Sequence, residues 1–178
     1  MLHEKWVISD THFYHRNTWA MFKKADGSSL RPFNSTDEMN MTMWNNWNKV
    51  VMPNDYVYHL GDVTFDYTKT FFNFFRGLNG HKRLILGNHD KITTGNFILL
   101  FEKVELWKGV TETNKLPWTM SHIPQRLESI RWGNCNIHGH THDAVLDDPH
   151  YINVCVETRN YTPIHFDTIH EEIKQRLS

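Results

Sequence analysis

The sequence has few cysteines, no long apolar run and almost no net charge. Its only cysteines, Cys135 and Cys155, form no C-x-x-C pair, and we expect both to be small buried hydrophobes in a reducing compartment. The net charge is −1 with the histidines neutral, which gives no electrostatic support for a general binder of nucleic acid or of acidic membranes.

The start of the chain, MLHEKWVISD, holds an apolar run that is too short for a signal-peptide core, and no stretch approaches a membrane span. We therefore expect a cytoplasmic protein, or one that works in the host cytoplasm if a phage encodes it. The sequence has no internal repeat, low-complexity tract or linker rich in Pro, Gly or Ser, so we predict a single domain over residues 1–178.

Aromatic residues are abundant, with 11 Phe, 7 Trp and 6 Tyr in a chain that is 39% hydrophobic. A chain of 178 residues is long enough for one domain with a sizeable core. The composition therefore predicts globular order rather than disorder.

Short β-rich runs alternate with helical patterns along the chain. Strands are predicted at Lys5–Ser9, Asp55–Leu60, Lys82–Leu86, Trp118–Ser121, Cys135–His138, Ile152–Val156 and Ile164–Phe166. This alternation early in the chain, followed by strand-rich sequence, predicts an α/β fold with a mixed sheet or two stacked sheets.

Three segments carry helix signals. Ser35 followed by Glu38 is a capping-box pattern, and Met39, Met43 and Trp47 then recur at helical spacing as a core-facing stripe. The other two helices are predicted over Tyr67–Arg76, ended by Gly77, and over Asp167–Leu177, with Asp167 or Thr168 as the N-cap.

The run HGHTHD at 138–143 places three histidines at alternate positions, which point the same way in an extended chain. Imidazole is the commonest side-chain metal ligand, although an isolated H-x-H is more often a polar surface turn. Other polar donors also follow predicted strands, where ligands collect in α/β folds. The full set is Asp10, His12, Asp62, Asn88, His122, His140 and His142.

These seven oxygen and nitrogen donors suit divalent cations, and the lack of a thiolate argues against a structural zinc knuckle. Seven ligands are too many for one catalytic ion that keeps open positions, whereas two ions that share one bridging carboxylate would use them well. Gly61, Gly87 and Gly139 each precede a proposed ligand, where a tight turn or a close backbone approach would aim the donor inward.

The ordered set SDTH, GD, GNHD, SH and GHTH resembles the calcineurin-like metallophosphoesterase superfamily. The motifs run from Asp10 to His142, and RPFNSTDEMN and INV…NYTPIHF are similar to segments of its small single-domain bacterial and phage members. The resemblance implies two stacked mixed β-sheets flanked by helices in a four-layer sandwich. It also implies a hydrolase that acts on phosphoric ester bonds.

The resemblance assigns a role to each motif residue. It gives Asp10, His12 and His142 to the first metal, gives Asn88, His122 and His140 to the second, and makes Asp62 the bridge. His89 is similar to the family's non-ligand histidine, which faces the substrate phosphate and protonates the leaving oxygen or stabilises developing charge. Asp90 would orient His89, or would instead face solvent or cap the turn.

One position departs from the pattern of the Ser/Thr phosphatase branch. That branch pairs its histidine with an aspartate three residues after the GD aspartate, and here Phe65 stands at this position, with Asp66 one residue further. The partner that orients His89 is therefore open, and the resemblance to protein phosphatases is weaker.

The expected mechanism is attack on phosphorus by a hydroxide that a dinuclear metal centre activates, with no covalent enzyme intermediate. Nitrogen and oxygen ligands suit Mn²⁺, our first choice, and also Fe, Ni, Co or Zn. His15, Arg16 and Asn17 follow the first motif and are candidates for substrate binding, with a solvated loop as an equal alternative. His138 lies one step before the glycine of GHTH, and we expect it to support a ligand or to pack rather than to bind metal.

We therefore predict a metal-dependent phosphodiesterase acting on a small phosphoester or nucleotide, with phosphomonoesterase or nucleotidase as the alternative. A non-catalytic metal-binding scaffold is the third possibility, although the ligand set is complete. The charge balance does not favour extended nucleic-acid binding, and no membrane partner is expected. The seven tryptophans permit an aromatic dimer interface and equally permit a dense core.

Overall fold

The computed structural model describes residues 3–130 and 134–178. Its helices are α1 (Asn17–Ala20), α2 (Thr36–Val50), α3 (Lys69–Arg76) and α4 (Phe166–Leu177), with short 3₁₀ turns η1 (Phe97–Leu100), η2 (Leu127–Ser129) and η3 (Val156–Thr158). Its strands are β1 (Lys5–Ile8), β2 (Tyr56–His59), β3 (His81–Ile85), β4 (Lys103–Glu105), β5 (Trp107–Val110), β6 (Trp118–Ser121), β7 (Cys135–His138), β8 (Tyr151–Asn153) and β9 (Ile164–His165). No helix in these two ranges is long and apolar enough to cross a membrane.

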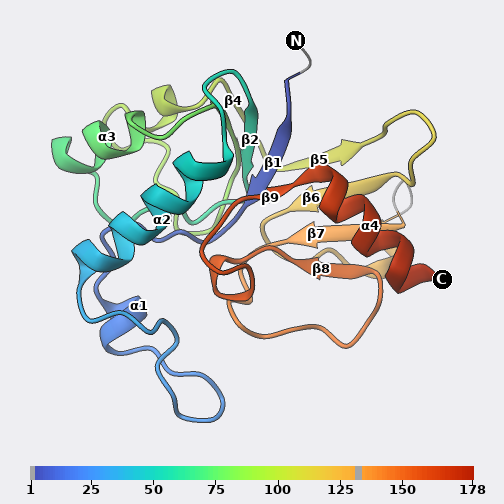
Figure 1. Cartoon of the computed structure of the whole chain (residues 1–178), viewed down its shortest axis with the longest axis horizontal. Helices are drawn as coiled ribbons and strands as arrows, with labels where there is room; N and C mark the ends of the chain where they lie inside the picture. Colours follow the sequence, from blue (N-terminus) through green and yellow to red (C-terminus); the bar gives the residue numbers. More distant parts are fainter. Residues whose placement is uncertain (1–2, 131–133) are drawn as a thin grey trace.

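The strands form two mixed sheets, one of five strands in the order β4-β3-β2-β1-β9 and one of four in the order β5-β6-β7-β8. In the first sheet only β9 runs antiparallel to its neighbour, and in the second only β5 does. Helices α2 and α3 lie beside the five-stranded sheet, and α4 lies beside the four-stranded one (Figure 1). The α/β fold with two mixed sheets and flanking helices is thus confirmed.

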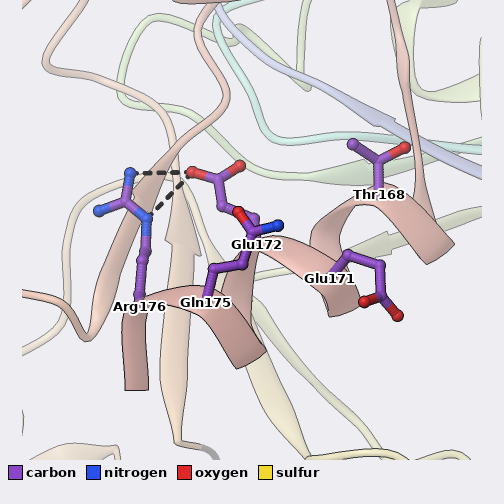
Figure 2. Close-up of a pocket in the computed structure, with 5 residues that line it drawn as sticks. All are labelled: Thr168, Glu171, Glu172, Gln175 and Arg176. Carbon is purple, nitrogen blue, oxygen red and sulfur yellow. Dashed lines mark hydrogen bonds and ion pairs between the residues drawn. The ribbon is translucent and has the colours of Figure 1, made fainter. Parts of the chain in front are cut away.

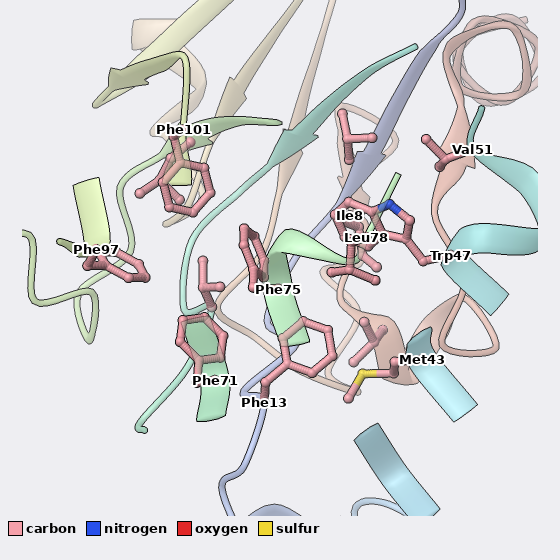
Figure 3. Packing of buried hydrophobic residues seen from close by; sticks show 14 of the residues in the cluster. Ile8, Phe13, Met43, Trp47, Val51, Phe71, Phe75, Leu78, Phe97 and Phe101 are labelled. Carbon is pink, nitrogen blue, oxygen red and sulfur yellow. The ribbon is translucent and has the colours of Figure 1, made fainter. Parts of the chain in front are cut away.

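One hydrophobic cluster lies between the first sheet and helices α2 and α3. Met39, Met43 and Trp47 lie four residues apart on one face of α2 and are all buried, as the helical stripe predicts. The rings of Phe71 and Phe75 from α3 pack into the same cluster (Figure 3). Each fully buried side chain of this size contributes about 1.5–3 kcal/mol of burial free energy, so this face is a main source of stability.

A second cluster joins the two sheets. Val7 and Ile8 are neighbours on β1 and point to opposite faces, so Ile8 belongs to the first cluster and Val7 to the second. Trp118 of β6 and Phe166 of α4 meet edge to face with ring centroids 4.7 Å apart. Both cysteines are free and buried, as expected from the sequence.

The helix starts show one predicted cap and one correction. Ser35 caps α2, since its hydroxyl accepts the Glu38 N–H at 3.0 Å. The cap expected at Asp167 or Thr168 is wrong, because α4 begins at Phe166 and His165 Nδ1 accepts the Asp167 N–H at 3.2 Å. An imidazole nitrogen replaces the usual carboxylate or hydroxyl at this helix start.

Three elements were not predicted, namely α1, β4 and β5. Helix α1 is a single turn of four residues, too short to carry a periodic signal. Strand β4 has three residues and β5 contains Gly109, so neither shows a run of strand-forming residues. Their pairing with β3 and β6 therefore depends on tertiary contacts rather than on local sequence.

Candidate metal centre

The polar motifs lie at the carboxyl ends of parallel strands in both sheets. The first sheet supplies Asp10 and His12 after β1, Asp62 after β2 and Asn88 after β3, and the second supplies His122 after β6 and His140 and His142 after β7. Ser9 and Cys155 pair as an isolated parallel bridge between the sheets, and the Ser9 N–H donates to the Val154 carbonyl at 3.1 Å. This contact between Ser9 and the Val154–Cys155 segment, the sheet seam, brings the strand ends of both sheets to one edge.

Most of these donors sit on a left-handed backbone that side chains rarely adopt. Positive φ angles occur at Asp10 (56°), His12 (46°), Asp62 (56°), His140 (67°) and His142 (51°). Each such residue costs of order 1–3 kcal/mol and persists only where the surroundings fix it. Strain of this kind gathers at functional sites.

All three predicted glycines allow close backbone approach, and a Cβ on Gly61 would overlap the Gly87 backbone. A Cβ on Gly87 would overlap the Asp62 carboxylate, and one on Gly139 would overlap Ser9 and the Asp10 carboxylate. Glycine thus lets two loops of the first sheet approach each other at Gly87, and lets a loop of the second sheet approach one of the first at Gly139.

The donors form two groups, Asp10–His12–His142 and Asp62–His122–His140, and in each group one ligand atom per residue lies within 4.8 Å of the others. Asp62 Oδ2 lies 3.7 Å from His12 Nε2 in one group and 3.5 Å from His122 Nε2 in the other. The structure therefore brings one carboxylate oxygen of Asp62 between the two groups.

Asp10 presents one free oxygen to the centre. Its Oδ2 accepts the His140 N–H at 2.8 Å, the Cys155 thiol at 3.2 Å and the Ser9 hydroxyl, whereas Oδ1 is buried without a partner in the described residues. Burial alone would raise the pKa of Asp10, but the nearby imidazoles, with His12 Nε2 at 3.7 Å from Oδ1, outweigh it and hold the pKa below its usual range. Asp10 is thus a buried carboxylate.

His12 has no hydrogen-bond partner at either ring nitrogen within the described ranges, although it is buried. Burial lowers the pKa of His12, so its imidazole is neutral. Buried polar atoms without partners are rare, and each calls for an unseen partner. A divalent cation bound by neutral imidazoles and carboxylates would satisfy them, so the residues fit the metals that the sequence implies.

The second group contains His122, whose two ring nitrogens have different neighbours. Its Nδ1 lies 2.7 Å from the Leu60 carbonyl and donates to it, which leaves the Nε2 lone pair free. Nε2 lies 2.8 Å from Asn88 Oδ1, so the amide oxygen also reaches this group. His140 and Asn88 are exposed, and the second group therefore opens to solvent.

Arg31 and Glu157 form a buried ion pair behind the first group, and neither was proposed from the sequence. Glu157 Oε1 lies 2.7 Å from Arg31 Nη2, 2.8 Å from Arg31 Nε and 3.0 Å from His142 Nδ1. Burial lowers the pKa of His142, but the bond to Glu157 reverses this and the net pKa is raised. The RPF segment was noted only as part of the resemblance, and 126 residues separate Arg31 from Glu157, so no local pattern pairs them.

His89 lies exposed at the mouth of the centre. Its main-chain N–H donates to Asp62 Oδ1 at 2.9 Å, and its ring lies 5.0 Å from the Phe65 ring, centroid to centroid. Phe65, which stands where the Ser/Thr phosphatase branch has an aspartate, thus lies beside the His89 ring.

Asp90 does not bond to the His89 imidazole in the described residues. Its carboxylate instead accepts three main-chain N–H groups, from Gly87 at 2.8 Å and from Asp62 and Val63 at 3.0 Å each. Burial raises the pKa of Asp90, and these N–H groups partly oppose the shift. Of the alternatives left open for Asp90, these contacts fit the turn cap, which fixes the GD loop against the GNHD turn.

Of the three residues proposed for substrate binding, His15 alone lies beside the centre. Its ring stacks on Phe65 at 4.1 Å and lies 5.7 Å from the His12 ring, and burial lowers its pKa to about 4. Arg16 is exposed with its guanidinium 5.9 Å from the Trp19 ring, and Asn17 opens α1. Within residues 3–130 and 134–178, no contact connects Arg16 or Asn17 to either donor group, so the solvated-loop alternative fits them.

His138 is fully buried at the end of β7 and belongs to neither group. Its Nδ1 lies 2.9 Å from the Gly139 carbonyl and its ring lies 6.0 Å from the Tyr151 ring. These contacts fit the packing role expected from the sequence. The HGHTHD run therefore holds two histidines of the donor groups and one core histidine.

A groove of about 300 Å³ lies next to Asn88 and His122, and three aliphatic side chains, Leu86, Leu106 and Ile123, line it. A larger hollow of about 540 Å³ lies on α4, lined by Thr168, Glu171, Glu172, Gln175 and Arg176, with the Arg176 guanidinium bound to Glu172 (Figure 2). The larger hollow contains none of the grouped donors. The chemistry of the site, rather than the size of a hollow, therefore identifies the candidate centre.

The two mixed sheets and the His/Asp groups at their shared edge agree with the arrangement that the sequence resemblance implies. The chain belongs to the family of the uncharacterized protein MJ1445 of Methanocaldococcus jannaschii, to which it is 35% identical over 92% of its own length and 88% of that protein. No protein-family model matches the sequence.

The chain is also similar to a phage protein and to one solved structure. Gene 66 protein of Mycobacterium phage L5 is 27% identical, over 82% of this chain and 80% of the phage protein. The crystal structure of AQ665, a protein of unknown function from Aquifex aeolicus, superposes with a TM-score of 0.72 at 25% identity, over 96% of this chain and 99% of that one. Each of these three proteins is matched over at least 80% of its own length.

Proposed function

We propose that this chain is a metal-dependent phosphodiesterase with a dinuclear centre. The observation that carries the proposal is the position of Asp62 Oδ2, within 3.7 Å of a ring nitrogen in each donor group. Asp10, His12 and His142 would hold one ion, Asn88, His122 and His140 the other, and Asp62 would bridge them. Mn²⁺ is our first choice, and Fe, Ni, Co or Zn also suit these ligands.

When bound, the two cations would acidify a water to form the nucleophile and would neutralise charge on the phosphoryl oxygens. The residues of the chain fix the geometry of this step. Asp90 holds the Asp62 loop through three N–H groups, and the His89 N–H holds Asp62 Oδ1, which leaves Oδ2 for the centre.

We assign His89 as the group that protonates the leaving oxygen. Its main chain is fixed at both sides, because its N–H donates to Asp62 and its carbonyl accepts the Tyr67 hydroxyl at 3.2 Å. Its side chain is exposed and packs only against neighbouring rings, so it is free to reach a bound ester.

The surroundings favour a diester over a monoester. The aliphatic groove beside His122 can take one ester arm, and the stacked rings of His15 and Phe65 can take the other. Among the residues that the structure describes, Arg31 is the only Lys or Arg side chain that bonds to a donor-bearing loop, and Glu157 already balances its charge. A monoester, which carries nearly two negative charges at neutral pH, would lack a further side-chain cation here.

The substrate would be a small phosphoester or nucleotide, hydrolysed in the cytoplasm by one domain that spans the chain. The free buried thiols support a reducing compartment. The single domain is supported by one candidate site that draws on residues from Asp10 to His142, and by α4 packing on β1.

The test removes metals with a chelator, restores single metals, and compares a para-nitrophenyl phosphodiester with the matching monoester. We expect no turnover without metal and recovery with Mn²⁺, with higher kcat/KM for the diester. A preference for the monoester would instead identify a phosphomonoesterase or nucleotidase. Binding of metal without hydrolysis of either ester would indicate the non-catalytic scaffold.

A further inference from the structure

The two donor groups differ in what lies behind them. In the first group, the ring nitrogen of His142 that faces away from the centre donates to Glu157, a buried carboxylate. In the second group, the corresponding nitrogen of His122 donates to the main-chain carbonyl of Leu60. A carboxylate partner makes an imidazole a stronger ligand than a neutral carbonyl does, because it stabilises the positive charge that metal binding draws onto the ring.

Arg31 connects this carboxylate to the other ligands of the first group. Its Nη2 donates to the Asp10 carbonyl at 2.6 Å and its Nη1 donates to the Thr11 carbonyl at 2.8 Å. These bonds hold the strained backbone between Asp10 and His12, where both residues have positive φ. One guanidinium therefore fixes the loop that carries two ligands and also balances the charge of Glu157, which supports the third.

The buried pair is poorly explained as a device for stability alone. Burying two charges costs nearly as much as their attraction returns, and apolar residues of similar volume often replace such pairs without loss. The contacts here all converge on one donor group, since the three bonds to Glu157 end on Oε1 and come from Arg31 and His142. The contacts of Arg31 and Glu157 are therefore those expected of residues that position the ligands of the first donor group.

Resting on the proposed dinuclear centre, we propose that Arg31 and Glu157 make the Asp10–His12–His142 group the tighter of the two metal sites. The Asp62–His122–His140 group is then the exchangeable site. Solvent exposure acts in the same direction, because His140 and Asn88 of the second group are exposed whereas Asp10 and His12 are buried.

The key variant is Glu157→Gln, which keeps the shape and one acceptor oxygen but removes the charge. Its matched control is Glu171→Gln, which removes a carboxylate from an ion pair with Lys174 on α4, outside both donor groups. Metal-free wild type and both variants are titrated with Mn²⁺, with stoichiometry and two dissociation constants as the readout. We expect Glu157→Gln to raise the smaller Kd by about 10–100-fold and to leave the larger Kd within a factor of about three, with no change in the control.

The outcomes separate this inference from the proposed function. Wild type that binds no Mn²⁺ would refute the metal centre itself. Two ions bound with equal affinity, or a Glu157→Gln effect on the weaker site, would refute the asymmetry while leaving the centre in place.

A measurement on wild type covers the case in which Glu157→Gln does not fold. Protein carrying a single Mn²⁺ after dialysis is crystallised, and anomalous scattering locates the ion. Density among Asp10, His12 and His142 supports the inference, and density among Asp62, His122 and His140 overturns it.

Discussion

His89→Ala provides the sharpest test of the mechanism, because loss of this exposed side chain should leave the rest of the structure intact. The ring is exposed, has no side-chain hydrogen bond within residues 3–130 and 134–178, and lies 5.0 Å from the Phe65 ring and 6.2 Å from the His12 ring, centroid to centroid. We therefore expect the free energy of unfolding to change by no more than about 0.5 kcal/mol, as for an ordinary surface substitution. Both Mn²⁺ ions should remain bound.

Turnover should nevertheless fall strongly. Loss of a positioned general acid costs about 10²–10⁴-fold in rate, which corresponds to about 3–5 kcal/mol of transition-state stabilisation. The loss should depend on the leaving group, since a para-nitrophenolate departs without a proton whereas an alkoxide requires one. His89→Ala should thus be mildly impaired on an activated diester and severely impaired on an alkyl diester.

The assay compares kcat for a series of diesters with leaving groups of increasing pKa, together with metal content by mass spectrometry. His150→Ala is the control, because His150 is another partly exposed histidine and bonds to Asp148 away from the centre. An equal loss on every ester would refute proton donation by His89. Loss of a metal ion in His89→Ala would show that it is a ligand.

Three further predictions concern stability. Burial lowers the pKa of His59 from 6.5 to about 3, so below pH 6.5 the unfolded chain takes up a proton that the folded chain does not. Urea unfolding of metal-free protein should therefore show a free energy of unfolding that falls from pH 6.5 toward pH 3. The fall should be smaller in His59→Asn, which removes this titrating group. Ser35→Ala should cost about 1 kcal/mol in urea unfolding, because the Glu38 N–H loses its cap, and an unchanged midpoint would contradict the capping role. His138→Ala should lower stability by about 1–3 kcal/mol through a cavity beside Tyr151 yet keep full Mn²⁺ binding, and loss of metal would overturn its packing role.

The parts of the fold that the sequence predicts are those with a local signal. The buried strands and α2 carry apolar runs or a helical stripe, and their predicted positions agree with the structure to within one or two residues. The predicted strand Ile152–Val156 is shorter in the structure, since β8 ends at Asn153 and Val156 begins the η3 turn. The early end of β8 leaves room for the η3 turn, which places Glu157 within hydrogen-bond distance of His142.

The candidate site was predictable where a motif follows a strand and not where two distant segments meet. The seven donors lie in short motifs, and the parallel order of the strands brings them together. Arg31 and Glu157 have no such signal, since an arginine in a loop and a glutamate in a turn are ordinary surface residues until the fold buries them together. For Asp90 the sequence left two roles open, because a side-chain pattern does not show which main-chain N–H groups a carboxylate will meet.

The sheet seam has a consequence for how the chain matures. Each proposed ion would take ligands from both halves of the sandwich, the segment up to Asn88 and the segment from His122 onward. A nascent chain emerging with only its first half therefore carries three of the four proposed ligands of the first ion and two of the four of the second, and neither coordination shell is complete until the second half has docked. Metal binding would thus occur late in folding, after the two halves of the chain have docked correctly.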